Sequence, residues 1–224
     1  MDAAGDALGD ALGAAAWDAV WTALGSGATV LASHPGLAQA LAAEYDRRQL
    51  AGGRRSWPRP AIETLQAWLA RAWARCGDRL LLSPAHELRL WQEIVAEAEA
   101  PLLDAAATAA TAAEAWRLAH AWRLDWDSAD WQQSEDTAAF GGWSRQFTVL
   151  IRQQGWITAA ELPAAVAAAI RGTRAAGALG PAPINGRGSL EPPARLALAG
   201  FDQLTPALAS LVAALHGAGA QAEV

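Results

Sequence analysis

Short apolar runs and helical stripes of apolar residues alternate along the chain. Residues 28–33 form an apolar run of strand length, set off by the turn residues 25–27. Leu37, Leu41 and Tyr45 follow this run at helical spacing. A strand, a turn and a helix in this order are typical of the opening of an α/β layer.

The same pattern returns near residue 200. Residues 195–201 form a second apolar run, a helix is expected to begin at Thr205-Pro206, and residues 220–224 fit a further strand. A shorter strand pattern at 61–64 follows the first helix. Because helical crossovers connect parallel strands, we predict that residues 28–33 and 195–201 lie side by side and parallel in one sheet.

Helices predominate between these two parts. An apolar stripe over residues 65–76 has the spacing i, i+3, i+4, i+7, i+8, i+11 and predicts the clearest helix. Ser83-Pro84 supplies a cap and a proline for the next helix, and further helices are expected at 104–124 and 140–151.

The last helix of this region has two possible starts. Thr158 and Glu161 fit a capping box, whereas the late position of Pro163 favours a start near Glu161. The tryptophans in these stripes fall at apolar positions, so we expect all of them to pack in the core: Trp68, Trp73, Trp91, Trp116, Trp122 and Trp143.

These patterns predict a predominantly helical α/β fold, in which a small parallel sheet carries a large helical insertion. The expected parts are an N-terminal helical extension (1–27), a strand–helix–strand part (28–64), the helical insertion (65–179), a linker loop (180–193) and a returning strand–helix–strand part (194–224). Because few strands are visible, we expect the chain to be truncated from a longer one.

Composition excludes one common chemistry. All 17 basic residues are arginines, and the lysine that a phosphate-binding loop requires is therefore missing. The glycines at 25–27 also precede their strand, whereas a nucleotide-binding loop follows one. We expect no ATP hydrolysis and no cofactor.

Charge and cysteine usage suggest a location and limit the partners. The net charge is −6, so any contact with nucleic acid must be local. One cysteine, no basic start and no apolar run of about 20 residues favour a soluble cytoplasmic protein without a membrane partner.

No catalytic or metal-ligating constellation is evident. The four histidines, His34, His86, His120 and His216, are far apart, so we expect no metal site. Cys76 closes an apolar stripe and is expected in the core. Ser33 precedes a helix, which favours a helix cap over a nucleophile, and Asp202 fits a turn or cap.

One short loop combines basic and aromatic residues. Arg54, Arg55, Trp57 and Arg59 follow one another within residues 53–59. Arginines can hold a phosphate backbone while an indole stacks on a base, although a solvated loop is the simpler interpretation. These four residues are the candidate DNA-binding residues.

Five segments, in the same order, resemble bacterial AddB/RexB-like proteins, in particular probable DNA repair proteins with a C-terminal PD-(D/E)XK nuclease. The segments are Ala28–Leu41, Trp57–Ile62 with Trp68-Leu69, Leu81–Glu87 with Trp91, Ala115–Trp122 and Leu198–Pro206. The turn at residues 33–36 departs from the family, which has asparagine and arginine there.

The resemblance implies a degenerate helicase-like N-terminal region with a helical insertion in its sheet. It also implies a process, DNA repair on single-stranded or end DNA, and the remainder of a larger repair protein or complex as a partner. The nuclease motif itself is absent from the sequence.

Two other classes stay open. A free-standing helical adaptor for protein–protein interaction would suit the acidic charge, and a small α/β enzyme would suit the strands. The strand–helix–strand pattern at 194–224 argues against the adaptor, and the missing catalytic constellation argues against the enzyme.

Overall fold

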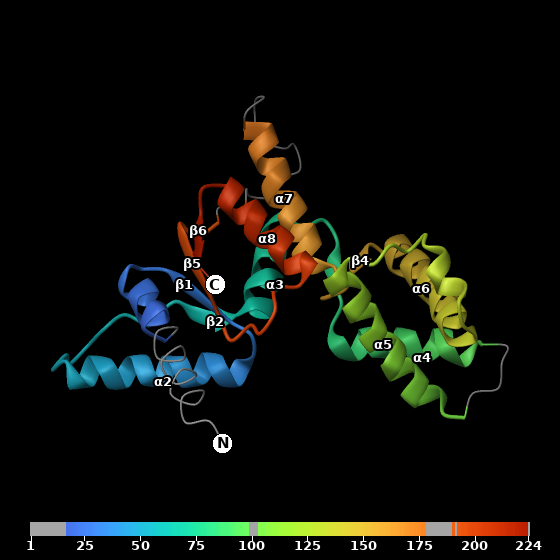
Figure 1. Ribbon diagram of the computed structural model, residues 1–224, viewed down its shortest axis with the longest axis horizontal. Coiled ribbons are helices and arrows are strands. Elements are labelled where there is room, and N and C mark those ends of the chain that lie inside the picture. The colour runs from blue at the N-terminus through green and yellow to red at the C-terminus, as the bar shows by residue number, and fades with distance from the viewer. Residues whose placement is uncertain (1–16, 99–102, 178–189, 191, 224) are drawn as a thin grey trace, which may run out of the picture. The chain divides into compact units, whose positions relative to one another are not determined.

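The computed structural model describes residues 17–98, 103–177, 190 and 192–223. The chain divides into two compact units. Figure 1 labels their helices and strands and colours the chain from blue at the N-terminus to red at the C-terminus. The sheet unit comprises residues 1–68, 191–203 and 212–224, and the helical unit comprises residues 69–190 and 204–211. The fold is α/β and predominantly helical, as the sequence predicts.

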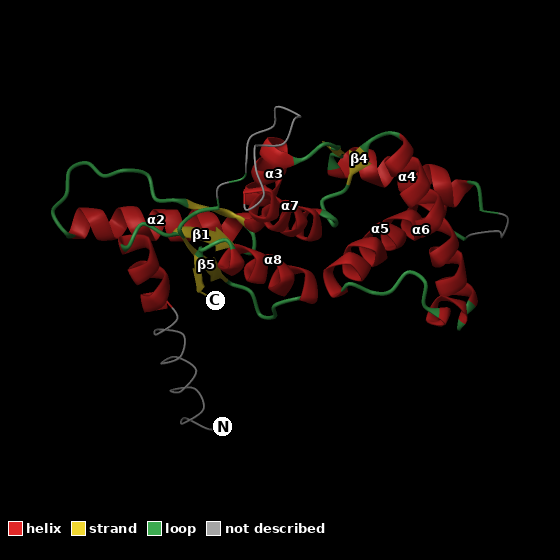
Figure 2. Cartoon of the chain, turned by 90° about the horizontal axis from the view of Figure 1, so that it is seen from above, coloured by secondary structure: helices red, strands yellow, loops and turns green. Residues whose placement is uncertain are grey.

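Four parallel strands form the sheet unit, in the order β2-β1-β5-β6. They are β1 (Thr29–Ala32), β2 (Ile62–Thr64), β5 (Arg195–Ala199) and β6 (Gln221–Glu223), drawn in yellow in Figure 2. The register places Val30 of β1 between Ile62 of β2 and Ala197 of β5. The predicted parallel pairing of residues 28–33 with residues 195–201 is therefore confirmed.

Both faces of β1 are covered, as is usual for a central parallel strand. Val30, Leu31 and Ala32 are fully buried. A helical segment at residues 17–25 and the helix α2 (Pro35–Ala51) supply apolar side chains to one core. That core consists of Val20, Ala23, Ala28, Val30, Leu41, Ala197 and Ala199.

The helical unit contains most of the remaining helices. They are α4 (Pro84–Ala96), α5 (Ala105–Trp122), the short 3-10 helix η1 (Ala129–Gln132), α6 (Glu135–Gln153) and α7 (Leu162–Gly177). Two further helices, α3 (Leu65–Cys76) and α8 (Pro206–Gly217), each have residues in both units. Ser83 caps α4 by accepting the His86 N–H, as predicted.

Stacked aromatic rings fill the core of the helical unit. Trp91 is fully buried, and its ring centroid lies 4.2 Å from that of Phe147, 5.8 Å from Trp116 and 6.3 Å from Phe140. Such pairs contribute beyond simple area burial. The large rings compensate for the many alanines, which bury little area each.

Trp73 closes the C-terminal end of α3. Its indole is 7% exposed, and its Nε1–H donates to the Arg79 carbonyl at 2.8 Å. The ring lies so close to Gly77 that a Cβ there would collide with it. Trp68, Trp91 and Trp116 are buried as well, so their predicted core packing is confirmed. Trp143 is half-buried, and the prediction is wrong for Trp122, which is 47% exposed near the end of α5.

Some expectations need correction. The strand predicted at 195–201 ends at Ala199, because Gly200 takes the left-handed φ of +76°. A second sheet, formed by β3 (Leu80–Leu81) and β4 (Trp156–Ile157), has no counterpart among the predicted strands. α7 begins after Glu161, which confirms the later of its two possible starts.

Parts of two predicted segments lie outside the described residues. These parts are residues 1–16 of the N-terminal extension and most of the linker at 180–193. The predicted bounds of the extension and of the linker therefore stay predictions. No helix in the described part of the chain is both long enough and apolar enough to cross a membrane.

The packing of Trp73 generates a stability prediction. Trp73→Ala should lower the free energy of unfolding by about 3–5 kcal/mol, because it empties a nearly enclosed site and removes the bond to Arg79. Urea unfolding followed by circular dichroism measures this change. Trp122→Ala is the matched control, since its side chain is 47% exposed and should shift stability by no more than about 0.5 kcal/mol.

Candidate functional site

The junction between β1 and α2 is the first candidate, because β1 lies where the strand order of the sheet reverses. The chain moves from β1 to β2 on one side, and β5 pairs on the other side. In open parallel sheets, ligands bind outside the carboxyl ends of the strands at such a point. The helix that follows β1 would there turn its N-terminal amides toward a phosphate.

In this chain a side chain engages one of those amides. His34 is the N-cap of α2, and its Nδ1 accepts the Leu37 N–H at 3.2 Å. Across the junction, Gly200 packs directly on Leu37 and Ser33, where a Cβ on residue 200 would collide with the Leu37 side chain. The junction is therefore held by protein contacts between the ends of β1 and β5.

The expectation that Ser33 caps α2 is wrong. The Ser33 N–H donates to the Ala199 carbonyl at 3.0 Å, so this residue still belongs to the strand end. The cap falls one residue later because Pro35 occupies the first helical position. An imidazole nitrogen accepts the amide hydrogen as a serine oxygen would.

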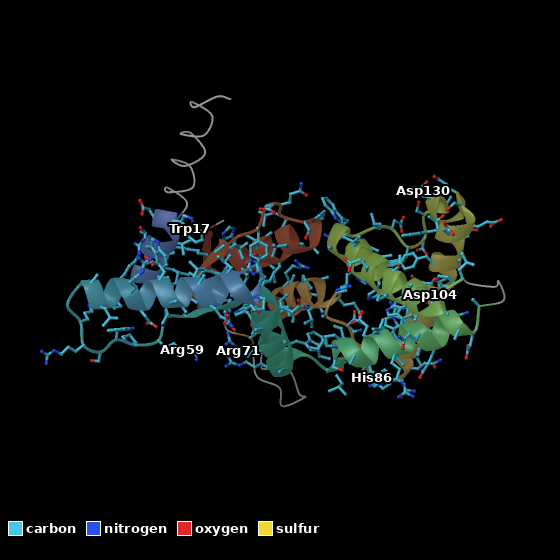
Figure 3. All side chains as sticks on the ribbon, turned by 90° about the horizontal axis from the view of Figure 1, so that it is seen from below. Trp17, Arg59, Arg71, His86, Asp104 and Asp130 are labelled. Carbon is cyan, nitrogen blue, oxygen red and sulfur yellow. The ribbon has the colours of Figure 1, made fainter. Side chains whose placement is uncertain are left out.

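The basic loop of the sheet unit is the second candidate. Arg54, Arg55 and Arg59 are exposed, and Trp57 is half-buried, all in the irregular segment between α2 and β2. Figure 3 labels Arg59 on this loop. The structure thus keeps the four predicted residues on one short surface segment.

Trp57 is less free than the sequence pattern indicates. Its Nε1–H donates to Oδ1 of Asp46 on α2 at 2.6 Å, which tethers the indole to the helix. A tethered ring loses less conformational entropy when it stacks on a base. The same bond places the negative charge of the Asp46 carboxylate beside this indole.

A buried polar cluster in the helical unit was not predicted as a group. Glu161 accepts from the Thr158 N–H at 2.9 Å and from the Thr158 hydroxyl at 3.0 Å, and pairs with Arg79 at 3.4 Å. The Thr158 hydroxyl also accepts the Trp116 Nε1–H at 3.1 Å, and Thr158 is fully buried. Only the spacing of Thr158 and Glu161 hinted at this cluster, through the capping-box pattern.

Two ionisable groups near this cluster have shifted pKa values. Burial raises the pKa of Glu87, with Arg117 opposing the shift and Glu161 adding to it. Burial lowers the pKa of His120, and Glu161 opposes that shift. The His120 ring lies 4.3 Å from the Trp116 ring, and its Nε2 has no hydrogen-bond partner within the described residues.

The hydrogen bonds of this cluster connect α5 to the segment between β4 and α7 within the helical unit. Thr158 is fully buried, so its hydroxyl, which donates to Glu161, is not accessible to a substrate in this structure. Across the described ranges, no three His, Cys, Asp or Glu residues are placed to hold a metal ion.

Cys76, which the apolar stripe placed in the core, is only half-buried, because it is the last residue of α3. Its Sγ–H donates to the Ala72 carbonyl at 3.3 Å, and burial raises its pKa. A thiol with a raised pKa is a poor nucleophile.

In comparisons with known proteins, no protein-family model matches the chain and no curated protein matches its sequence.

The closed junction generates a binding prediction. Mg-ATP should show no affinity tighter than millimolar, because the chain lacks the phosphate-binding lysine and His34 engages the first-turn amide. Isothermal titration calorimetry with Mg-ATP, with MgCl₂ alone as the control, measures this. A saturable micromolar isotherm would contradict it.

The shifted pKa of His120 generates a pH prediction. Below its usual value of about 6.5, the unfolded chain binds a proton that the folded chain resists, so stability should fall as pH drops through this range. Wild type should therefore lose free energy of unfolding relative to His120→Gln between pH 7.5 and pH 5. A pH-independent difference between the two would exclude this linkage.

Glu87 should act in the opposite direction. Its raised pKa means that the folded chain retains a proton that the unfolded chain releases above about 4.5, so stability should fall as pH rises. Glu87→Gln removes this pH dependence. Its free energy of unfolding should therefore rise relative to that of wild type as pH increases from 4.5 to 7.5. Urea midpoints at matched pH values for wild type and both variants separate the two effects.

Proposed function

We propose that this chain is a non-catalytic, helicase-like module of a bacterial DNA repair protein, similar to the N-terminal region of AddB/RexB-like proteins of the PD-(D/E)XK nuclease family. Its role is structural and includes contact with a DNA strand or with the rest of a repair complex in the cytoplasm. The observation that carries this proposal is the junction between β1 and α2.

The junction retains the framework of a nucleotide-binding sheet without its ligand chemistry. α2 follows β1 at the point where the strand order reverses. A helix follows a strand at the same point in parallel sheets that bind phosphates. Here the His34 imidazole accepts one first-turn amide hydrogen of α2, and Gly200 lies against the Leu37 side chain beside it. A degenerate helicase-like sheet, which keeps the fold and loses hydrolysis, accounts for both facts.

The arrangement of the chain also supports the proposal. In the sequence, residues 69–190 of the helical unit come after β2 and before β5, the two strands that flank β1 in the sheet. A helical insertion at this place is what the resemblance implies.

The basic loop supplies the candidate DNA contact. Arg54, Arg55 and Arg59 are exposed, and no shorter segment of the sequence holds as many positive charges around an indole. Pro58 and Pro60 flank Arg59 and restrict the loop, which lowers the entropy lost on binding. Three arginines neutralise about three phosphates, so binding should be weak and salt-sensitive.

A second candidate function, a helical protein–protein adaptor, has one observation in its favour. Leu118 and Trp122 lie one turn apart on α5 and are 50% and 47% exposed, and Leu124 just beyond the helix is 47% exposed. Exposed apolar groups of this kind occur at interaction surfaces. An adaptor without a DNA role predicts no strand binding at any salt concentration.

Strand binding distinguishes the two functions. Fluorescence anisotropy with a labelled single-stranded oligonucleotide at low salt should show binding by the full 224-residue chain. The Arg54/Arg55/Arg59→Ala variant should bind more weakly, and its log–log salt dependence should be shallower by about 2 if three phosphates are lost.

The matched control removes three other exposed arginines, Arg89, Arg145 and Arg152, which lie on α4 and α6 of the helical unit. This control changes net charge by the same amount and should bind nearly as wild type does. Equal binding by the loop variant and wild type would exclude the loop, and no binding by wild type would favour the adaptor.

A further inference from the structure

A pocket of about 350 Å³ opens in the sheet unit between the helical segment 17–25 and α2. Trp17 and Trp21, one helical turn apart, line it from the first segment, and Ala40 and Leu41 line it from α2. Leu41 is 2% exposed and lies deep, whereas the Trp17 side chain is 44% exposed. The short Ala40 side chain leaves room opposite the two indoles.

The polar rim of this pocket carries net positive charge. Glu44 binds both Arg47 and Arg48, with the Arg48 Nε 2.8 Å from Oε1. The Arg48 guanidinium also lies over the Trp21 ring, 4.2 Å from its centroid, which fixes both side chains. The Arg47 side chain is 78% exposed and retains N–H donors beyond its contact with Glu44.

An occupant must match an aromatic wall, a cationic rim and a small volume. The volume is at the lower end of ligand pockets, which suits a single flat ring with its attached anionic group. Bases of a single strand stack on indoles in a sequence-tolerant way, while arginines hold the neighbouring phosphate. The stacked bases of a duplex present no free ring face to such a wall.

We propose that this pocket takes one unstacked base of single-stranded DNA, with the ring against Trp17 and a phosphate on Arg47. The inference rests on the proposed function, since it names a second contact point for the same strand. Trp17 and Arg59 lie on opposite sides of α2 in Figure 3, so the pocket and the basic loop are separate sites that can be tested one at a time.

Photocrosslinking tests the assignment directly. A single-stranded oligonucleotide containing 5-iododeoxyuridine is bound to the full chain, irradiated and digested with trypsin. Arg47 is the first basic residue, so residues 1–47 stay in one peptide, which contains Trp17 and Trp21. Pro60 protects Arg59 from cleavage, so Trp57 of the loop falls in the separate peptide 56–71.

We expect an adduct on peptide 1–47 that fragmentation places at Trp17. Trp17→Ala should abolish this adduct and weaken binding about 5- to 160-fold, the range that loss of one stacked base produces. Arg47→Gln tests the rim independently and should make the salt dependence shallower by about one phosphate contact. Trp122→Ala, an exposed tryptophan of the helical unit, is the control and should bind as wild type does.

The outcomes separate this inference from the proposed function. An adduct only on peptide 56–71, with unchanged binding by Trp17→Ala and Arg47→Gln, would overturn the pocket and leave the DNA role in place. An adduct at Trp17 together with wild-type binding by the Arg54/Arg55/Arg59→Ala variant would support the pocket and exclude the loop. No adduct and no binding would overturn both.

Discussion

The pairing of β1 with β5 is the constraint on which the sheet unit depends. The two strands are far apart in sequence, yet they share a continuous register from Thr29 beside Leu196 to Ala32 beside Ala199. The entropy lost in closing such a long loop grows only with the logarithm of its length, and a folded insertion reduces that loss further. A large helical unit can therefore lie between two strands of one small sheet.

The periodic parts of the fold were predictable from the sequence. A stripe such as that of α3 repeats over three turns, and the apolar runs at β1 and β5 are bounded by glycine or proline turns, so each element is indicated by more than one signal. The sheet of β3 and β4 was not predictable, because a strand of two residues has no measurable period. The end of β5 depended on the backbone angle of a single residue, Gly200.

The candidate sites were likewise predictable only where their residues are close together in the sequence. The arginine-rich loop could be recognised because its residues are neighbours in sequence. The Trp57–Asp46 bond and the Trp116–Thr158 bond join residues that only the fold brings together. The cap of α2 is His34 and not Ser33 for one local and one long-range reason. Pro35 fixes the start of the helix, and the Ser33 N–H donates to the carbonyl of Ala199 on β5.

The continuous segment of the helical unit has a consequence for synthesis on the ribosome. Residues 69–190 emerge as an unbroken stretch that includes the whole aromatic core around Trp91, so this core can pack while the chain is still growing. β1 and β2 are made earlier but must wait for β5, and during that interval one edge of β1 has no partner strand. An apolar strand with an open edge is prone to pair with other chains. Until β5 is translated, β1 therefore keeps one edge open to strands of other chains.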